Sequence, residues 1–302
     1  MPSLPLAFPL DLSATLMGGQ TFCWSENPVG VFSGWIGQIP LQIHVQDGHL
    51  CWNNPAMSHL WMERYFCLDL DVPAILGKGA TDPWLTRASQ AHPGLRPVRE
   101  DPWECLVNFL CSSLKQIVQI RQINTRIRST LGDTSDSFPS PGALARAGEK
   151  ALRNCSLGYR ARHVARTAQI VADNPEFLTI PSSLSTSAAA QHLEQLPGVG
   201  PKISRCVLLY AYSRWDAFPV DVWVDRLIRS LYFPRRRKAF RFEELERWSH
   251  RQFGMGRGLA QLWLFHWFRN LPNPRSSHLT KRLCLHLPTN DEPREVVPSR
   301  QR

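Results

Sequence analysis

Near its start the chain alternates apolar and polar positions in the manner of β-strands. Between residues 21 and 52, short runs such as GVFSGWIG and LQIHVQDGHLCW set β-branched and aromatic residues between turn signals, among them Gln46-Asp47-Gly48. Runs of this kind joined by a Gly-containing turn are typical of hairpins. The pattern predicts an antiparallel sheet.

The period of the pattern then changes to that of helices. The segment NNPAMSHLWMERYF has helical spacing, and a loop-rich crossing over residues 77–102 follows it. From Pro102 to about Asn270 the apolar positions recur almost throughout at helical spacing, which predicts a series of helices. Seven helical stretches stand out, at residues 103–132, 161–174, 188–196, 201–213, 221–231, 242–253 and 259–270.

These two patterns together predict an α+β fold. We expect an N-terminal antiparallel sheet domain with a flanking helix over residues 1–95 and a mostly helical domain over residues 96–272. A chain of 302 residues is long enough to bury a substantial core. Residues 273–302 are rich in Pro, Arg and Ser and show no sustained period, which predicts a disordered tail.

The charge of the chain favours a polyanionic partner. Lys and Arg number 35 against 25 Asp and Glu, which gives a net charge of +10. An excess of this sign raises the local concentration of phosphates, so nucleic acid is favoured over a membrane, although many basic proteins bind neither. No stretch approaches the ~20 apolar residues of a membrane span, and the first residues lack the pattern of a signal peptide. We expect an intracellular protein that binds no membrane.

The cysteines give no indication of a metal site. The eight are scattered without a CxxC pair, at positions 23, 51, 67, 105, 111, 155, 206 and 284. Structural zinc and iron–sulfur clusters require closely spaced cysteines or histidines. We therefore expect buried thiols in a reducing compartment, and neither a metal nor a cofactor.

The segment LPGVGPK, residues 196–202, predicts a tight reversal between two helices. Gly198 and Gly200 can adopt the positive φ of such a turn, and Pro201 suits the first position of the next helix. The result is a helix–hairpin–helix, whose free backbone N–H groups suit a DNA phosphate. A plain connector between two helices fits the same residues.

Lys202 opens this second helix, and Asp221 follows nineteen residues later in FPVDVW. Alone, the lysine is explained as a solvated surface charge and the aspartate as a helix cap. As a pair on the same side of one compact unit, they can serve as an amine nucleophile and its carboxylate partner.

Six motifs in order resemble the helix–hairpin–helix, Gly/Pro-Asp superfamily of DNA glycosylases, and within it the 8-oxoguanine DNA glycosylase branch. They are GGQTFCW (18–24), DPWECLVNFLCSS (101–113), LGYRAR (157–162), LPGVGPKISRC (196–206), FPVDVW (218–223) and GRGLAQLWLF (256–265). The resemblance covers residues 8–272. The lack of a four-cysteine cluster separates the chain from iron–sulfur members, and Lys202 separates it from members that use water.

The resemblance implies roles for the catalytic pair and for the base pocket. Lys202 is expected to attack C1′ of the damaged nucleotide and form a Schiff base, while Asp221 stabilises the charge that develops on the sugar. The expected base-binding residues are Gly19, Cys206, Gln261 and Phe265. The carbonyl of Gly19 is expected to accept the N7–H, and Gln261 to contact the Watson–Crick edge. Phe265 is expected to stack on one face of the base and Cys206 to cover the other. Without the resemblance, the i, i+4 pair in the last helix is equally explained by core packing.

The resemblance also implies DNA contacts. Tyr159 resembles the residue that wedges into the gap left by the flipped base, although an ordinary buried tyrosine fits the pattern too. The other expected contacts are Gln116, Arg160, Gly198, Gly200 and Trp223.

The chain departs from the family at two positions that contact DNA. Leu114, Lys115 and Gln116 stand where an asparagine run is common, and Gln119 stands where an arginine reads the opposite cytosine. Trp223 replaces a histidine usual in the animal enzymes. These departures predict a weak preference for cytosine opposite the lesion.

The sequence thus predicts a monomeric bifunctional DNA glycosylase and AP lyase that flips 8-oxoguanine out of duplex DNA, in a bacterial nucleoid or a eukaryotic nucleus. Two alternatives remain open. One is the same chemistry on another oxidised or ring-opened purine. The other is a noncatalytic helix–hairpin–helix module that binds DNA.

Overall fold

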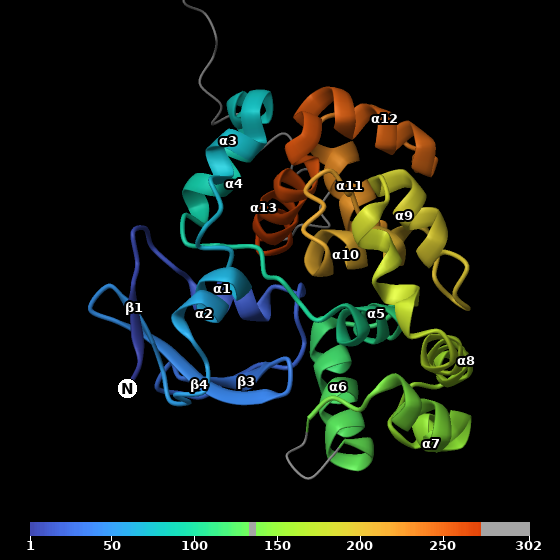
Figure 1. The fold of residues 1–302 in the computed structure, drawn as a ribbon. Coiled ribbons are helices and arrows are strands. Elements are labelled where there is room, and N and C mark those ends of the chain that lie inside the picture. The colour runs from blue at the N-terminus through green and yellow to red at the C-terminus, as the bar shows by residue number, and fades with distance from the viewer. Residues whose placement is uncertain (133–136, 273–302) are drawn as a thin grey trace, which may run out of the picture.

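The computed structural model describes residues 1–132 and 137–272. The predicted tail, residues 273–302, lies outside this part. A small sheet with two helices against it forms one side of the molecule, and a helical body forms the other (Figure 1). This arrangement confirms the predicted α+β fold. In the described part, no helix is both long enough and apolar enough to cross a membrane.

Five antiparallel strands form the sheet in the order β1-β5-β4-β3-β2. They are β1 (Ser3–Pro5), β2 (Ser25–Glu26), β3 (Phe32–Ile36), β4 (Ile39–Gln46) and β5 (His49–Trp52). The turn between β4 and β5 is the predicted one, and its two residues, Asp47 and Gly48, have φ of 48° and 74°. Two consecutive positive φ values match the right-handed twist of a two-residue hairpin. Strand β1 was not predicted, because three residues are too few to show an alternating pattern.

The inner face of the sheet has its own core. Ile43, Leu50 and Trp52 are fully buried and pack with Met62 and Phe66. The helices that supply this cover are α1 (Leu12–Met17) and α2 (His59–Tyr65). The predicted helix near NNPAMSHLWMERYF is therefore confirmed.

The helical body has a second, larger core. Its α-helices are α3 (Val72–Leu76), α4 (Pro83–Ala91), α5 (Pro102–Leu110), α6 (Ile117–Leu131), α7 (Pro141–Asn154), α8 (Arg160–Asp173), α9 (Thr186–Leu193), α10 (Pro201–Ala211), α11 (Val222–Leu231), α12 (Phe242–Phe253) and α13 (Arg257–Arg269). Short 3₁₀ turns lie at Gly77–Thr81, Pro175–Leu178, Ile180–Ser183 and Gly254–Gly256.

The prediction of a loop-rich crossing over residues 77–102 is wrong for Pro83–Ala91, which form α4. Asp82 caps this helix by accepting hydrogen bonds from the backbone N–H groups of Trp84 and Leu85, and Pro83 occupies its first turn. Trp84, Leu85 and Ala88 are buried in the core of the helical body, and α4 lies beside α13 (Figure 1). The Asp-Pro start is a usual helix signal, but the surrounding Gly and Pro residues obscured it.

The long helical stretch at residues 103–132 is two helices. Helix α5 ends at Leu110 and α6 begins at Ile117, and between them Leu114 has a φ of 55°. A positive φ is rare for a residue with a branched side chain. The turn between α5 and α6 projects into the region of the catalytic pair described below.

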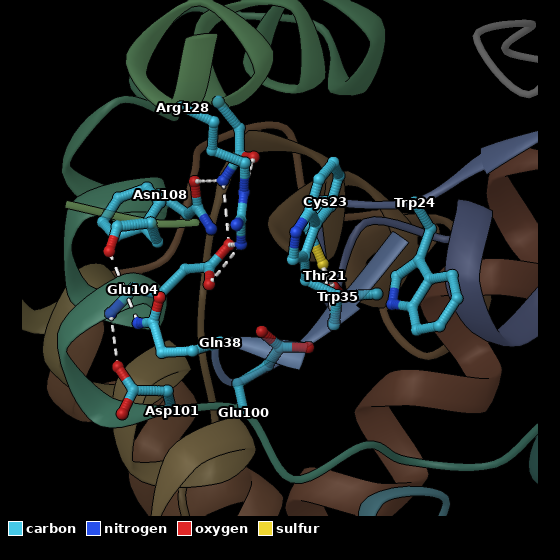
Figure 2. Close-up of polar contacts among 12 residues, drawn as sticks. Thr21, Cys23, Trp24, Trp35, Gln38, Glu100, Asp101, Glu104, Asn108 and Arg128 are labelled. Carbon is cyan, nitrogen blue, oxygen red and sulfur yellow. Dashed lines mark hydrogen bonds and ion pairs between the residues drawn. The ribbon is translucent and has the colours of Figure 1, made fainter. Parts of the chain in front are cut away.

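A buried polar network joins α5, α6 and the sheet (Figure 2). Arg128 donates from Nη2 to both carboxylate oxygens of Glu104, each at 2.7 Å. Asn124 donates to Glu104 at 3.0 Å and to Asn108 at 2.9 Å. The Arg128 guanidinium also lies 4.6 Å from the ring centroid of Trp35, which belongs to β3. Because removal of one partner would leave a buried charge unpaired, this network fixes α5 against α6 and the sheet.

Glu100 occupies a second buried position at this junction. Its Oε1 accepts a 2.6 Å hydrogen bond from the hydroxyl of Tyr65, which in turn accepts one from Trp24 Nε1 at 2.9 Å. Burial, followed by the nearby carboxylate of Glu104, raises the pKa of Glu100 from 4.5 to about 8. At neutral pH the folded protein therefore keeps this carboxyl protonated.

We expect Glu100→Gln to flatten the dependence of stability on pH. The unfolded chain ionises this carboxyl above pH 4.5, whereas the folded protein holds its proton until about pH 8. The free energy of unfolding of the wild type should therefore fall as pH rises through this window, by at most about 1.4 kcal/mol per pH unit. Urea unfolding at several pH values within the window measures the effect.

Glu176→Gln is the matched control, because Glu176 is exposed in a 3₁₀ turn. It should leave the slope unchanged. Parallel pH profiles for the wild type and Glu100→Gln would contradict the assignment of Glu100.

Candidate active site

Lys202 and Asp221 line one cleft of about 450 Å³ where several elements meet. We call it the outer cleft. Its remaining lining residues come from the segment after α1, the turn between α5 and α6, and helices α5, α6, α11 and α13: Gly19, Phe22, Phe109, Ser112, Lys115, Gln116, Ile117, Val118, Ile120, Trp223, Phe265 and Arg269. The cleft thus combines residues from the N-terminal part with the ends of helices in the helical body.

The predicted helix–hairpin–helix places Lys202 at the start of α10. Helix α9 ends at Leu193, and Pro201 is the first residue of α10. Gly198 has the predicted positive φ, 82°, and a Cβ there would lie 2.8 Å from the ring of His163. The prediction of a positive φ at Gly200 is wrong, because its φ is −111°. Gly200 is the N-cap of α10 and adopts an extended conformation, so one left-handed residue is enough to make this turn.

The amine of Lys202 faces the turn between α5 and α6. Its Nζ donates a 2.9 Å hydrogen bond to Ser112 Oγ and lies 4.8 Å from the ring centroid of Phe109. Cys206 follows one turn later on α10. Burial, with a smaller contribution from Asp221, raises the pKa of the Cys206 thiol to about 11, although Lys202 acts in the opposite direction. The thiol is therefore neutral, so Lys202 remains the predicted nucleophile of this helix.

Asp221 caps α11 and lines the cleft with the same carboxylate. Its Oδ1 accepts hydrogen bonds from the backbone N–H groups of Trp223 and Val224, both at 2.9 Å. In the described part of the chain, Oδ2 makes no hydrogen bond. The cap holds the carboxylate in place and leaves one oxygen for the cleft. Asp221 can therefore act both as a helix cap and as the predicted partner of the amine.

A smaller hollow of about 50 Å³ shares five lining residues with the outer cleft: Gly19, Phe109, Lys202, Asp221 and Phe265. We call it the inner hollow. It is lined by all four predicted base-binding residues, Gly19, Cys206, Gln261 and Phe265. The side-chain oxygen of Gln261 is buried and has no hydrogen-bond partner among residues 1–132 and 137–272. A buried acceptor without a partner is costly, so this atom is suited to a ligand that donates a hydrogen bond.

Gly19 is held at the mouth of the inner hollow by close packing. Its φ is 101°, and a Cβ there would lie 2.5 Å from Ile117 Cδ1. The next residue, Gln20, is buried and donates from its amide to the carbonyls of Thr15 and Arg96, both at 2.8 Å. The segment is therefore fixed on both sides, and only glycine fits this position without displacement.

Comparison with known proteins agrees with this geometry. The model of the 8-oxoguanine DNA glycosylase N-terminal domain matches residues 5–106, and that of the HhH-GPD superfamily of base excision DNA repair proteins matches residues 107–250. The chain belongs to the 8-oxoguanine DNA glycosylase family.

Individual members of the family are similar over most of the chain. The N-glycosylase/DNA lyase OGG1 of Arabidopsis thaliana is 28% identical over 77% of this chain and 67% of its own length. The solved Clostridium acetobutylicum 8-oxoguanine glycosylase/lyase, in complex with duplex DNA containing cytosine opposite 8-oxoguanine, is 25% identical, with a TM-score of 0.80 over 87% of this chain and 92% of that one. MBOgg1, solved with a low-affinity DNA ligand, is 28% identical, with a TM-score of 0.81 over 88% and 94%.

Two apolar side chains of this glycosylase family member project beside the outer cleft. Leu114 is 95% exposed and Tyr159 is 56% exposed. They lie on neighbouring segments, because the guanidinium of Arg160 donates to the carbonyl of Ser113. Tyr159 is therefore not the buried tyrosine that was the alternative explanation. Exposed apolar groups of this size next to a polar cleft are typical of a binding surface.

The remaining predicted DNA contacts differ in exposure. Arg160 is buried, and its guanidinium lies 4.4 Å from the Tyr159 ring centroid, so it supports the turn rather than projecting into solvent. Gln116 is exposed and Trp223 half-buried, and both line the outer cleft. Gln119 accepts a hydrogen bond from the backbone N–H of Gln116 at 3.0 Å, so its carbonyl oxygen caps α6.

Sequence reasoning missed Ser112, Phe109 and Arg269 as members of the site. The first two lie in the motif DPWECLVNFLCSS, which was recognised, but Ser112 is ninety residues from Lys202. No local pattern indicates that a particular serine of this motif meets the lysine. Arg269 lies at the end of a helix, where a basic residue has an ordinary explanation.

We expect Gly19→Ala to cost more stability than Gly30→Ala. Both glycines have a positive φ, 101° and 77°, but a Cβ at Gly30 has no neighbour within 4 Å, whereas one at Gly19 overlaps Ile117. The backbone strain is larger at Gly19, whose φ lies farther from the left-handed region, and the end of the Ile117 side chain can shift to relieve part of the overlap. Together the two effects predict a difference of roughly 1 kcal/mol. Urea unfolding of the two variants measures it. Equal losses would show that the segment at Gly19 moves freely.

Proposed function

We propose that this protein is a bifunctional DNA glycosylase and AP lyase that excises 8-oxoguanine from duplex DNA by flipping the base towards the inner hollow. At about 50 Å³ the hollow is smaller than a purine, so it widens as the base enters. One observation carries the proposal. The amine of Lys202, held 2.9 Å from Ser112 Oγ, and the carboxylate of Asp221 line both the outer cleft and an inner hollow that contains an unpartnered amide oxygen. The protein acts as a monomer on DNA in the nucleoid or nucleus.

Lys202 is the nucleophile for both steps. The lone pair of its amine attacks C1′ and the bond from C1′ to N9 breaks, so the base departs with the bonding electrons and takes up a proton. The adduct loses a proton and its sugar ring opens to a Schiff base. The Schiff base acidifies the C2′ proton, and loss of that proton breaks the bond from C3′ to oxygen. One amine therefore supplies base release and strand cleavage.

Asp221 stabilises the transition state of base release. Positive charge develops on the sugar as the base departs, and a carboxylate beside the reacting atoms is most effective in a site of low dielectric. The two hydrogen bonds to Oδ1 hold this charge in position before the reaction begins. Preorganisation of this kind lowers the barrier because the protein need not reorganise during the step.

The inner hollow recognises the lesion. Phe265 and the neutral thiol of Cys206 contact the two faces of the flipped base, and Gln261 contacts its Watson–Crick edge. The carbonyl of Gly19 accepts the N7–H that 8-oxoguanine has and guanine lacks, which contributes about 1–3 kcal/mol of discrimination. Base flipping is the usual solution for an enzyme that must reach a base within the duplex.

The surface around the outer cleft binds the duplex. Leu114 and Tyr159 enter the space that the flipped base leaves, a role that their exposure supports. Backbone N–H groups near Gly198 and Gly200 suit a phosphate at the start of α10. The net charge of +10 supports both contacts through long-range attraction.

We expect Lys202→Gln to abolish base release, strand cleavage and borohydride trapping on a duplex that contains 8-oxoguanine, and to retain binding. Lys115→Gln is the matched control, because Lys115 lines the same cleft and the substitution removes the same charge. This control should still form the trapped adduct. A Lys202→Gln variant that nicks at a rate near the wild type would contradict the assignment, and binding without nicking by the wild type would indicate a noncatalytic module.

We expect less than about tenfold preference in single-turnover rate for cytosine opposite the lesion. A good paired contact to the opposite base contributes about 1–3 kcal/mol, equivalent to roughly 5- to 150-fold. Here the exposed Leu114 cannot form a hydrogen bond, the Gln119 side-chain oxygen caps α6, and Arg160 is buried. Excision opposite each of the four bases measures the preference. A hundredfold preference for cytosine would show that other residues read it.

A further inference from the structure

Arg269 is a charged residue of the outer cleft to which the chemistry above gives no task. It is the last residue of α13, one turn after Phe265, and its guanidinium lies 5.8 Å from the Phe265 ring centroid. Its Nη1 lies 4.0 Å from the position that a Cβ on Gly19 would occupy. Within residues 1–132 and 137–272, the guanidinium makes no hydrogen bond or salt bridge.

A second arginine, Arg121, lies close enough to Arg269 for their charges to interact. Arg121 of α6 donates from Nη2 to the carbonyl of Met17 at 2.7 Å, while its Nε is buried and has no partner in the part of the chain that the structure describes. Burial is the main cause that lowers the pKa of both guanidinium groups, and the charge of Arg269 lowers that of Arg121 further. The nearby carboxylate is that of Asp221, which favours the charged form of Arg269 but already caps α11. The positive charge at this rim therefore exceeds the negative charge.

We propose that Arg269, supported by Arg121, binds a nonbridging oxygen of the phosphodiester next to the flipped nucleotide. The inference rests on the proposed function, because that function brings duplex DNA into the outer cleft. A guanidinium presents a planar fork of donors that matches a phosphate, and a partly buried charge attracts an anion more strongly than an exposed one.

The position of Arg269 favours a phosphate over the base. Arg269 lines the outer cleft and does not line the inner hollow, where Gln261 and Cys206 lie. A carbonyl group of the base is neutral and would not balance the two nearby guanidinium charges. A phosphodiester is negatively charged and would balance part of them. Because Phe265 and Arg269 are one turn apart on α13, this helix would hold the base and the backbone of one nucleotide together. That contact positions C1′ against Lys202.

The test compares Arg269→Leu with Arg251→Leu. Arg251 is an exposed arginine on α12 that lines neither the outer cleft nor the inner hollow, and its substitution removes the same charge. Binding is measured over a salt series to two duplexes. One duplex carries a tetrahydrofuran abasic analogue, and the other carries 8-oxoguanine. Both protein variants also carry Lys202→Gln. We expect Arg269→Leu to bind both duplexes about tenfold more weakly. Its slope of log K against log salt should be smaller in magnitude by about 0.9, since one phosphate contact is lost.

A neutral methylphosphonate placed in turn at each phosphate that flanks the lesion identifies the contact. At one position it should weaken the wild type and leave Arg269→Leu unaffected. Arg269→Lys, which keeps the charge but not the fork, should recover part of the affinity, and thermal unfolding of each variant checks that it is folded.

Three results would overturn the proposal. One is a loss confined to the 8-oxoguanine duplex with an unchanged salt slope, which would mean that Arg269 reads the base. The others are equal behaviour of Arg269→Leu and Arg251→Leu, and the absence of coupling to any methylphosphonate. Nicking of the 8-oxoguanine duplex by the wild type is recorded in parallel. If nicking persists while any one of these three results is obtained, the inference is wrong and the proposed function stands.

Discussion

The active site depends on the pair of hydrogen bonds through which Asp221 caps α11. They fix a negative charge at the positive end of a helix, where the helix dipole stabilises it. Lys202 lies at the start of another helix, α10, and Arg269 at the end of α13, and both line the outer cleft with this carboxylate. Helix ends are the rigid points at which a charged side chain can be held without further support. The chemistry of the cleft follows from their convergence.

The site is shared between the two parts of the molecule, so their junction determines its geometry. Gly19 comes from the N-terminal part and reaches the inner hollow because Gln20 and Ile117 confine it. The turn that carries Ser112 follows α5, whose position depends on the buried ion pair between Glu104 and Arg128. A disturbance of this ion pair would therefore displace residues of the cleft, although neither Glu104 nor Arg128 lines it.

Features that elsewhere would be unfavourable gather at the cleft. The buried oxygen of Gln261 has no partner, Leu114 is exposed with a positive φ, and Arg121 has a buried donor without an acceptor. Each costs stability in the free protein, and each is the kind of group that a bound duplex can satisfy. Strain and unsatisfied polar groups are expected where the structure serves binding rather than folding.

The sequence by itself determined those local features whose conformation depends only on a few neighbouring residues. The hairpin at Asp47-Gly48, the start of α10 at Pro201 and the cap at Asp221 each follow from a few adjacent residues. The motifs around Lys202 predicted a reactive amine there. The four predicted base-binding residues were named through a resemblance to a family, since no local rule brings Gly19 and Gln261 together.

Only the tertiary structure decided which side chains are buried and which charges meet. Arg160 is buried beneath Tyr159, Gly200 needs no positive φ, and α4 packs against α13, whereas the sequence pattern indicated otherwise. Arg121 and Arg269 are far apart in the chain and carry no signal of their proximity. Burial and electrostatics depend on which elements pack together, and that is a property of the whole fold, which no short stretch of residues contains.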